Sequence, residues 1–253
     1  MKITFLGTGT SQGVPVIACH CKVCTSSDVR NNRLRTSVMI EHQGKVFVID
    51  SGPDFRYQML REKVQQLDAI LFTHEHKDHV AGLDDVRAFN FKHDREIDVY
   101  AEERVQHALK NEFSYIFSGI HYPGIPRVVM HNISNETMHI QGVDIIPIRV
   151  MHYKLPVYGF RIGDFSYITD AKTISDEELE KIKGSKVLVL NALRREDHIS
   201  HFTLAEAVAL AQKLNVSQTY FTHISHQLGL HEEVCSELPA GISLAYDTMS
   251  IEI

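Results

Sequence analysis

One short segment of the sequence carries four side chains of the kinds that bind metal ions. The segment T-H-E-H-K-D-H begins at Thr73, and its candidate ligands are His74, His76, Asp78 and His79. On a helix His74 and His76 would point about 200° apart, so one helical face cannot present both to one ion. We therefore expect a loop between an apolar strand and a helix, with two side chains directed to one ion and two to another. Chance histidines in a polar loop are the alternative, and four ligand types this close together argue against it.

A centre with two divalent ions needs more ligands than this loop supplies. Such ions are commonly held by several imidazoles and a bridging carboxylate. Three downstream residues follow apolar runs that indicate strands, namely His152, Asp170 and His223. Each alone is also an ordinary residue for the end of a strand. Together they complete the ligand set of a two-ion centre.

A second group of candidate ligands consists of thiols. Three of the four cysteines, Cys19, Cys21 and Cys24, lie within six residues. In a reducing compartment clustered thiols are metal ligands more often than disulfide partners. A closed tetrahedral zinc site needs a fourth ligand, and the residue types leave His20, His226 and Cys235 as candidates. Three thiols without a metal are the alternative.

The elements that must position these residues are short strands and helices that recur in both halves of the chain. Strands are expected at 3–6, 38–40, 46–49, 69–72, 143–150, 160–169, 187–190, 219–222 and 242–246. Helices are expected at 80–91, 102–117, 176–183 and 203–214, the last beginning with a capping box of Thr203 and Glu206. Residues 41–45 are expected to connect a hairpin. The section 121–142 shows no clear period, and we expect loops and short strands there.

The first glycines of the chain are not a dinucleotide-binding loop. Gly7 and Gly9 follow the first apolar run, but that motif would need a third glycine where the chain has Gln12. We expect a turn that lets the backbone pass close to the metal centre.

The composition is that of an ordinary globular chain. The 253 residues include 43% hydrophobic and 23% charged residues and carry a net charge of -6. Because no linker-like segment interrupts the chain, one compact domain spanning residues 1–253 is expected. The negative charge disfavours long nucleic acid as a partner. The apolar run at the N-terminus is too short for a signal sequence or a membrane span, so a cytoplasmic location without membrane attachment is expected.

The order of the candidate ligands resembles the metallo-β-lactamase superfamily. The matching motifs are Asp50 after the run 46–49, the T-H-E-H-K-D-H segment, His152, Asp170 and His223. The resemblance implies a mixed α/β fold (α+β), a four-layer αββα sandwich with two ions at one edge. It assigns His74, His76 and His152 to the first ion, Asp78, His79 and His223 to the second, and Asp170 as the bridge. It also implies that Asp50 orients one of the ligands.

Within this superfamily the chain is most similar to the phosphodiesterase branch, typified by the cyclic phosphodiesterase of phosphonate breakdown. The matching segments are G-T-G-T-S-Q-G-V-P from Gly7 and G-L-D-D-V-R from Gly82. Members of this branch carry a C-x-C-x-x-C insertion that a downstream histidine closes. The resemblance therefore implies a small zinc-binding insertion at about 15–30, in which His226 joins the three cysteines around a structural zinc.

The function that the resemblance implies is metal-dependent hydrolysis of small or cyclic phosphodiesters. Two divalent ions, Zn or Mn, would lower the pKa of a shared water and stabilise charge on the phosphate. His201 matches the extra histidine of superfamily phosphodiesterases and is our candidate general acid, while Asp78 is counted with it as a catalytic residue. Glu196 or Asp197 would orient His201. Because family members often form dimers, a homodimer is a further expectation.

Other activities of the same fold are weighed against this one. A tRNA 3′-processing nuclease shares the metal motifs and the extra histidine, but the sequence shows no glycine-flanked arm or basic run. A thioesterase or lactonase would keep the ligands and leave His201 and the cysteine cluster unexplained. Flavo-diiron oxygen reductases usually have Glu at the position of His76 and carry a flavin domain. A non-enzymatic metal-binding scaffold is disfavoured because every expected ligand position is filled.

Overall fold

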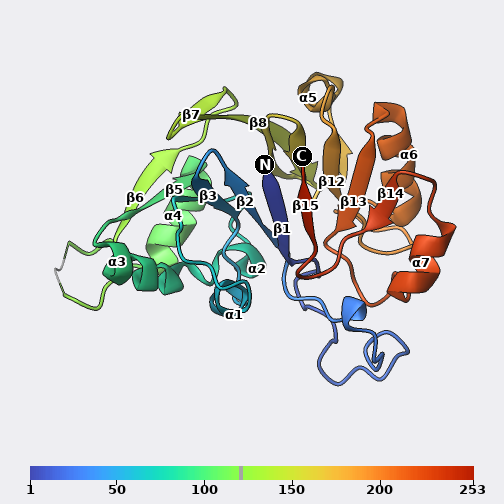
Figure 1. The fold of residues 1–253 in the computed structure, drawn as a ribbon, viewed down its shortest axis with the longest axis horizontal. Coiled ribbons are helices and arrows are strands. Elements are labelled where there is room, and N and C mark those ends of the chain that lie inside the picture. The colour runs from blue at the N-terminus through green and yellow to red at the C-terminus, as the bar shows by residue number, and fades with distance from the viewer. Residues whose placement is uncertain (120–121) are drawn as a thin grey trace.

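Two β-sheets form the centre of the computed structural model, which describes residues 1–119 and 122–253 (Figure 1). The first sheet has the order β15-β1-β2-β3-β4-β5-β6, and the second has the order β11-β8-β9-β10-β12-β13-β14 with β7 paired to β8. The first contains β1 (Lys2–Gly7), β2 (Ser37–His42), β3 (Lys45–Ile49), β4 (Ala69–Leu71), β5 (Ile97–Ala101), β6 (Val128–Asn132) and β15 (Ser250–Glu252). The second contains β7 (Met138–Ile140), β8 (Val143–His152), β9 (Leu155–Ile162), β10 (Phe165–Tyr167), β11 (Thr173–Ile174), β12 (Val187–Asn191), β13 (Gln218–Thr222) and β14 (Ile242–Leu244).

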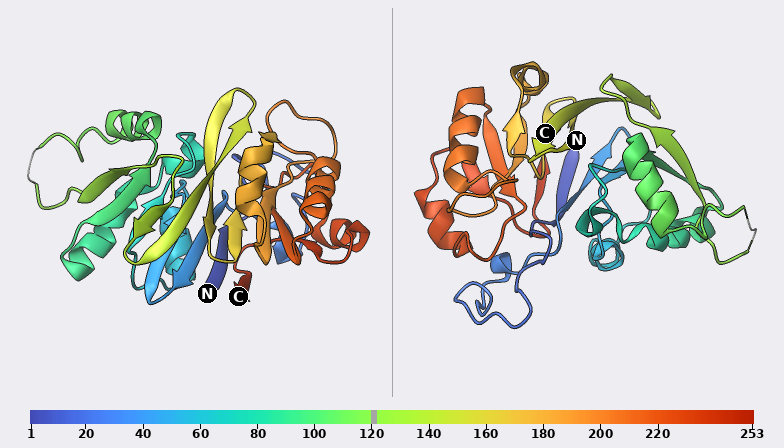
Figure 2. Two further views of the ribbon diagram at one scale, coloured as in Figure 1. Left: turned by 90° about the horizontal axis from the view of Figure 1, so that it is seen from above. Right: turned by 180° about the vertical axis from the view of Figure 1, so that it is seen from behind.

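Helices cover the outer faces of both sheets (Figure 2). On the first sheet lie α1 (Phe55–Arg61), α2 (Lys77–Val80), a 3-10 turn η2 (Leu83–Val86), α3 (Arg87–His93) and α4 (Glu103–Glu112). On the second lie α5 (Asp176–Ile182), α6 (Leu204–Leu214) and α7 (His231–Glu237). A short 3-10 turn, η1 (Val29–Asn31), closes the long N-terminal loop. The expected capping box is present at α6, where the Thr203 hydroxyl and the Glu206 carboxylate satisfy each other's backbone N–H groups.

Side-chain alternation along the strands produces three apolar layers between the elements. In β1, β2 and β3 the residues Phe5, Ile40 and Phe47 pack between the sheets, while Met39 and Val48 pack under the helices. Both faces of these strands are buried, so their sequences are continuous apolar runs, and each such side chain contributes about 1.5–3 kcal/mol of burial free energy. This layering confirms the predicted αββα sandwich.

Three expected elements differ in their limits. The helix expected at 80–91 is split into α2, η2 and α3, because the chain passes too close to its neighbours at Gly82 for a side chain. A Cβ there would lie 2.2 Å from the Gly52 carbonyl oxygen. The strand expected at 160–169 is two strands, β9 and β10, separated by a turn at Gly163, whose φ is +54°. The helix expected at 102–117 ends at Glu112 and continues as turns.

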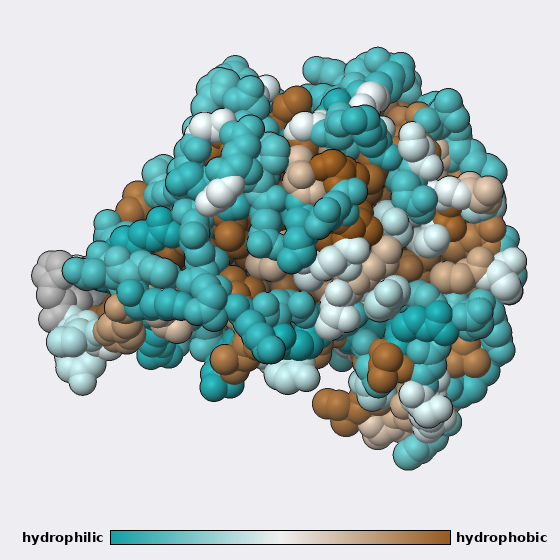
Figure 3. Space-filling model, in the orientation of Figure 1, coloured by the Kyte–Doolittle hydropathy of each residue, from teal (hydrophilic) through white to brown (hydrophobic). Residues whose placement is uncertain are grey.

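The section 121–142 contains β6 and β7 as short strands, in agreement with the sequence, although His121 lies outside the described residues. The connection of β2 to β3 is a tight hairpin, with Gln43 and Gly44 both at positive φ. Among the described helices none is long and apolar enough to cross a membrane. The face drawn in Figure 3 is mainly hydrophilic.

Candidate metal centre

The predicted ligands meet where strands of the two sheets end. Asp50 follows β3, Asp170 follows β10 and His223 follows β13, and all three are buried. Each has a positive φ, at 64°, 56° and 55° respectively. Left-handed backbone in a residue other than glycine costs about 1–3 kcal/mol and concentrates at functional sites. At these positions the strained turn separates the end of each strand from the loop that follows and aims a polar side chain at a common point.

Asp50 controls the orientation of two histidines in the T-H-E-H-K-D-H loop. One carboxylate oxygen accepts from the Thr73 amide at 2.9 Å, and the other accepts from the Thr73 hydroxyl at 2.8 Å and from His79 Nδ1 at 2.7 Å. Because the Thr73 hydrogen points at Asp50, the Thr73 oxygen accepts from His74 Nδ1 at 2.9 Å. Both imidazoles are therefore held through Nδ1 and direct Nε2 away from Asp50, so that Nε2 is the nitrogen available to a metal.

His76 and His152 lie on the same side of the centre as His74. His74 Nε2 and His76 Nδ1 are 2.9 Å apart, and the His152 ring centroid lies 5.3 Å from that of His76. His152 Nδ1 donates to the carbonyl oxygen of Ser200 at 3.0 Å, which leaves its Nε2 as the metal-binding nitrogen. The structure thus brings together the three histidines that were expected at the first ion.

Asp170 lies among the remaining candidates. His79 Nε2 is 3.4 Å from Asp170 Oδ2 and 3.3 Å from Asp78 Oδ2. His223 Nε2 is 3.2 Å from Asp170 Oδ1 and 3.8 Å from Asp78 Oδ2. Ligand atoms of His74 and His152 also lie within 4.8 Å of an Asp170 oxygen. Histidines from both groups therefore surround this carboxylate, as a bridging ligand requires.

At this centre, the described residues form three sets whose potential ligand atoms lie within 4.8 Å of one another. They are His74, His79 and Asp170; Asp78, His79 and His223; and His152, Asp170 and His201. His76 belongs to none of these sets and reaches the centre through its contact with His74. The sets therefore divide the same residues differently from the two groups implied by the resemblance, and they add His201.

The cluster has the polar chemistry of a cation site. His79 Nε2 and both nitrogens of His223 are buried and have no hydrogen-bond partner. A buried nitrogen without a partner costs about 1–3 kcal/mol, and a divalent ion would satisfy it. Burial opposes ionisation of Asp170, but the positive charge of His223 and His79 outweighs it and holds the Asp170 pKa well below its usual value. Burial likewise disfavours protonated His79, yet Asp170, Asp78 and Asp50 raise its pKa well above the usual value. Ionised carboxylates thus stabilise positive charge at the centre of the cluster.

His201 lies at the edge of the cluster and is 8% exposed. Its Nε2 donates to Asp170 Oδ1 at 3.1 Å. Burial lowers the pKa of His201 to about 4 despite the carboxylate beside it. The Asp197 carboxylate pairs with Lys172 at 3.0 Å. The other polar contacts of His201 are to the Ser200 hydroxyl and His198, and not to Glu196. The expectation that Glu196 or Asp197 orients His201 is therefore wrong.

The cysteine cluster closes on His226. The thiols of Cys19, Cys21 and Cys24 lie 3.3, 3.4 and 3.5 Å from His226 Nδ1. A backbone hydrogen bond from Cys24 lowers the pKa of the Cys21 thiol to about 6, which favours the thiolate that binds metals. Three sulfurs and one imidazole are the donor set of a closed tetrahedral zinc site. The structure gathers none of the other candidates here, since Cys235 lies 3.6 Å from His231 instead.

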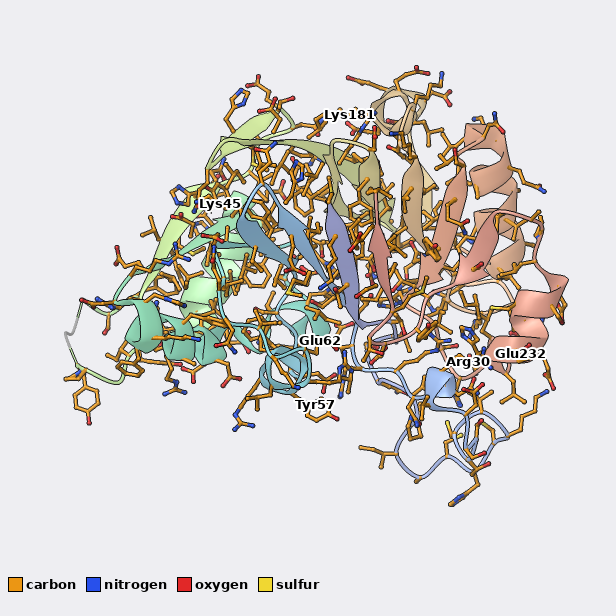
Figure 4. The ribbon with its side chains drawn as sticks, viewed as in Figure 1. Arg30, Lys45, Tyr57, Glu62, Lys181 and Glu232 are labelled. Carbon is orange, nitrogen blue, oxygen red and sulfur yellow. The ribbon has the colours of Figure 1, made fainter. Side chains whose placement is uncertain are left out.

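The loop that carries these cysteines is anchored on α7. Arg30 and Glu232, both labelled at the lower right of Figure 4, are joined by an ion pair of 2.8 Å, and Lys22 pairs with Glu233 at 2.7 Å. The backbone of Ile224, between His223 and His226, is hydrogen-bonded to Thr8 and Thr10 at 2.9 and 3.1 Å. The cysteine site therefore lies beside the metal cluster but shares no side chain with it.

Replacing Cys21 with Ser is expected to lower stability and zinc content before it affects chemistry. A loss of about 2–3 kcal/mol would lower the denaturation midpoint of a chain of this size by roughly 4–12 °C. The measurements are thermal unfolding and bound zinc per chain. Cys235→Ser is the matched control and should leave both unchanged. Unchanged stability with lost turnover in a folded Cys21→Ser protein would contradict a structural role.

Comparison with known proteins agrees with this geometry. The family of beta-lactamase superfamily domains matches residues 45–224. Among curated proteins, an octanoyltransferase from Porphyromonas gingivalis is 39% identical over 250 residues, which covers 98% of this chain and 50% of that protein. A ribonuclease Z from Synechocystis is 25% identical over 260 residues, covering 90% of this chain and 74% of that protein. The chain spans about half the length of the first curated relatives that it matches.

Two solved structures extend the comparison. The crystal structure of a diphosphatase from the PhnP family is 44% identical, has a TM-score of 0.93, and covers 100% of this chain and 97% of its own. The short form of human tRNase Z has a TM-score of 0.74 at 17% identity, with 100% and 99% coverage, and shares the fold alone. The family match covers most of the chain and the αββα layers place its ligand motifs at one edge, so this protein is a member of the metallo-β-lactamase superfamily.

Proposed function

We propose that this protein is a dinuclear metal hydrolase of small phosphodiesters, including cyclic ones, and of the chemically related diphosphates. The observation that carries the proposal is the 44% identity, over the full chain, to a diphosphatase of the PhnP family. Diphosphates and phosphodiesters share a phosphorus atom between two ester-like oxygens, and both need a nucleophile and protonation of a departing oxygen. His201 at the edge of the cluster supports this reading, because it offers a proton donor beyond the expected ligands.

Each group of residues in the site has a separate proposed role. His74, His76, His152, Asp78, His79, His223 and Asp170 would hold two divalent ions, Zn or Mn. When bound, such ions supply a hydroxide at neutral pH and stabilise charge on the phosphate. Asp50 fixes the rings of His74 and His79 through the contacts described above, and His201 donates a proton to the departing oxygen from Nε2. The four residues of the cysteine site would hold a separate zinc and take no part in the reaction.

The names of the curated relatives suggest two other activities. Several relatives are named ribonuclease Z, but the net charge of -6 does not favour a polyanionic tRNA. The octanoyltransferase is twice as long as the region matched here, so its acyl transfer is not carried over to this chain.

The test is a substrate panel with the metal-reconstituted protein. It should compare a 4-nitrophenyl phosphodiester, a cyclic nucleotide, a nucleoside diphosphate ester, a thioester, a lactone and a precursor tRNA. We expect kcat/KM for at least one small phosphorus ester to exceed that for the thioester and the lactone by more than about 100-fold. Preference for the thioester, the lactone or the tRNA would reject the proposed substrate class.

A further inference from the structure

The ring of His201 is enclosed by three other histidines. It stacks on His223 with a centroid distance of 4.8 Å and meets His152 edge-on at 4.5 Å. The third neighbour is His198, whose centroid is 4.9 Å away. Of the three, only His198 is outside the predicted ligand set. It is also the one that contacts the edge of His201 that points away from the metal cluster.

The two nitrogens of His201 face opposite ways. Nε2 points at Asp170, while Nδ1 lies 3.1 Å from His198 Nδ1 and 3.1 Å from the Ser200 hydroxyl. If the ring rotated by half a turn, Nε2 and a carbon would exchange places and no N–H would face the cluster. To act as a general acid His201 must carry a hydrogen on each nitrogen, and in that form its Nδ1–H donates to His198 Nδ1. This contact selects one of the two orientations.

The loop that carries His198 is itself held in place. The Ser200 amide donates to His198 Nδ1 at 3.3 Å, and the Ser200 carbonyl accepts from His152. The Phe202 amide donates to the carbonyl of Ala171 at 2.9 Å, directly after Asp170. His198 is partly buried, and burial lowers its pKa. These contacts fix the loop that carries His198 relative to His152 and Asp170, the two candidate ligands beside His201.

We propose that His198 is a positioning residue for His201: its Nδ1 accepts a hydrogen bond from His201 Nδ1 and so holds the ring with Nε2 facing the cluster of candidate ligands. This inference rests on the proposed function. The sequence supports no such role on its own, because His198 is one of 16 histidines and its partner is identified only by the loop conformation.

Two substitutions separate positioning from general loss of structure. In His198→Asn the amide group occupies the place of Nδ1, whereas in His198→Gln it occupies the place of Nε2. We therefore expect His198→Asn to retain the contact and His198→Gln and His198→Ala to lose it. Nitrogen NMR of the zinc-loaded protein reads this directly, since the His201 Nδ1 signal should shift in the Gln and Ala variants and stay near its wild-type position in the Asn variant.

The kinetic test uses two diesters that share one alkyl group and differ in the departing group, a 4-nitrophenolate or an alkoxide. His198→Ala should lower kcat for the alkoxide diester by about 10- to 100-fold, as loss of an outer hydrogen-bond partner does elsewhere. KM should change by less than about twofold, and the nitrophenolate diester should be nearly unaffected. His198→Asn should restore most of the loss. In the His201→Ala background, His198→Ala should add no further loss, because the two act as one unit.

Several outcomes would overturn the assignment of His198. They are an equal loss on both diesters, equal defects in the Asn and Gln variants, an additive effect with His201→Ala, or an unshifted Nδ1 signal in His198→Ala. Failure of the proposed function has a different signature, because the wild-type protein would then cleave neither diester while the NMR comparison would still report on the contact.

Discussion

Replacing Asp78 with Ala is expected to lower kcat/KM for phosphodiesters by more than about 100-fold. The Asp78 carboxylate lies within 3.8 Å of two histidines of the cluster, so its loss removes a proposed ligand and a negative charge that stabilises the ions. Loss of an outer partner of a metal ligand already costs about 10- to 100-fold, so a direct ligand should cost more. The measurements are kcat/KM and bound metal per chain.

Asp144→Ala is the matched control for this experiment. Asp144 is exposed and pairs with His139 on the β7–β8 hairpin, outside the metal cluster. The control should keep both its metal and its turnover. Near-native turnover in Asp78→Ala with full metal content would argue that Asp78 is not a ligand.

Replacing His201 with Ala should slow alkoxide diesters far more than nitrophenolate diesters. General acids contribute about 100- to 10,000-fold, and a nitrophenolate departs without needing a proton. His201 is buried and directs Nε2 to the cluster, so we expect no solvent-exposed side chain to take over proton donation in the Ala variant. The experiment measures kcat/KM for the matched pair of diesters on wild type and variant.

Metal content distinguishes proton donation from ligation at His201. Because His152, Asp170 and His201 form one of the sets of closely spaced ligand atoms, this control is essential. Unchanged metal content with selective loss on the alkoxide diester supports a general acid. Loss of one ion would instead make His201 a ligand, and an equal loss on both diesters would indicate a role in binding.

The ligand cluster was predictable because its signal is local and dense. His74, His76, Asp78 and His79 lie within one short segment, and the remaining candidates come at the ends of apolar runs that form strands. Whether a residue lies at the end of a strand can be read from the sequence alone. Parallel pairing of β12 with β13 and of β3 with β4 then brings the carboxyl ends of these strands to the same edge of each sheet. The αββα sandwich was predicted from the resemblance that these same ligand motifs carry.

Other features depend on contacts between distant residues and have no local signal. The Arg30–Glu232 ion pair and the backbone hydrogen bond between Thr8 and Ile224 join residues about 200 positions apart. The packing of the cysteine loop against α7 was therefore not predictable from the sequence. The break at Gly82 arises from its approach to Gly52, which no periodicity reports. The role proposed for His198 has no local signal either, because two histidines three residues apart in an irregular loop follow no spacing rule.

The proposed activity requires two ions in the histidine and carboxylate cluster, separate from a zinc at the cysteine site. The most direct measurement is to remove weakly held metal with a chelator, return Mn or Zn in steps, and record bound metal and turnover of a 4-nitrophenyl phosphodiester together. We predict that one zinc per chain resists mild chelation while activity is lost, and that activity returns as two further ions bind. Full activity with only the cysteine-bound zinc, or with no metal at all, would contradict the account.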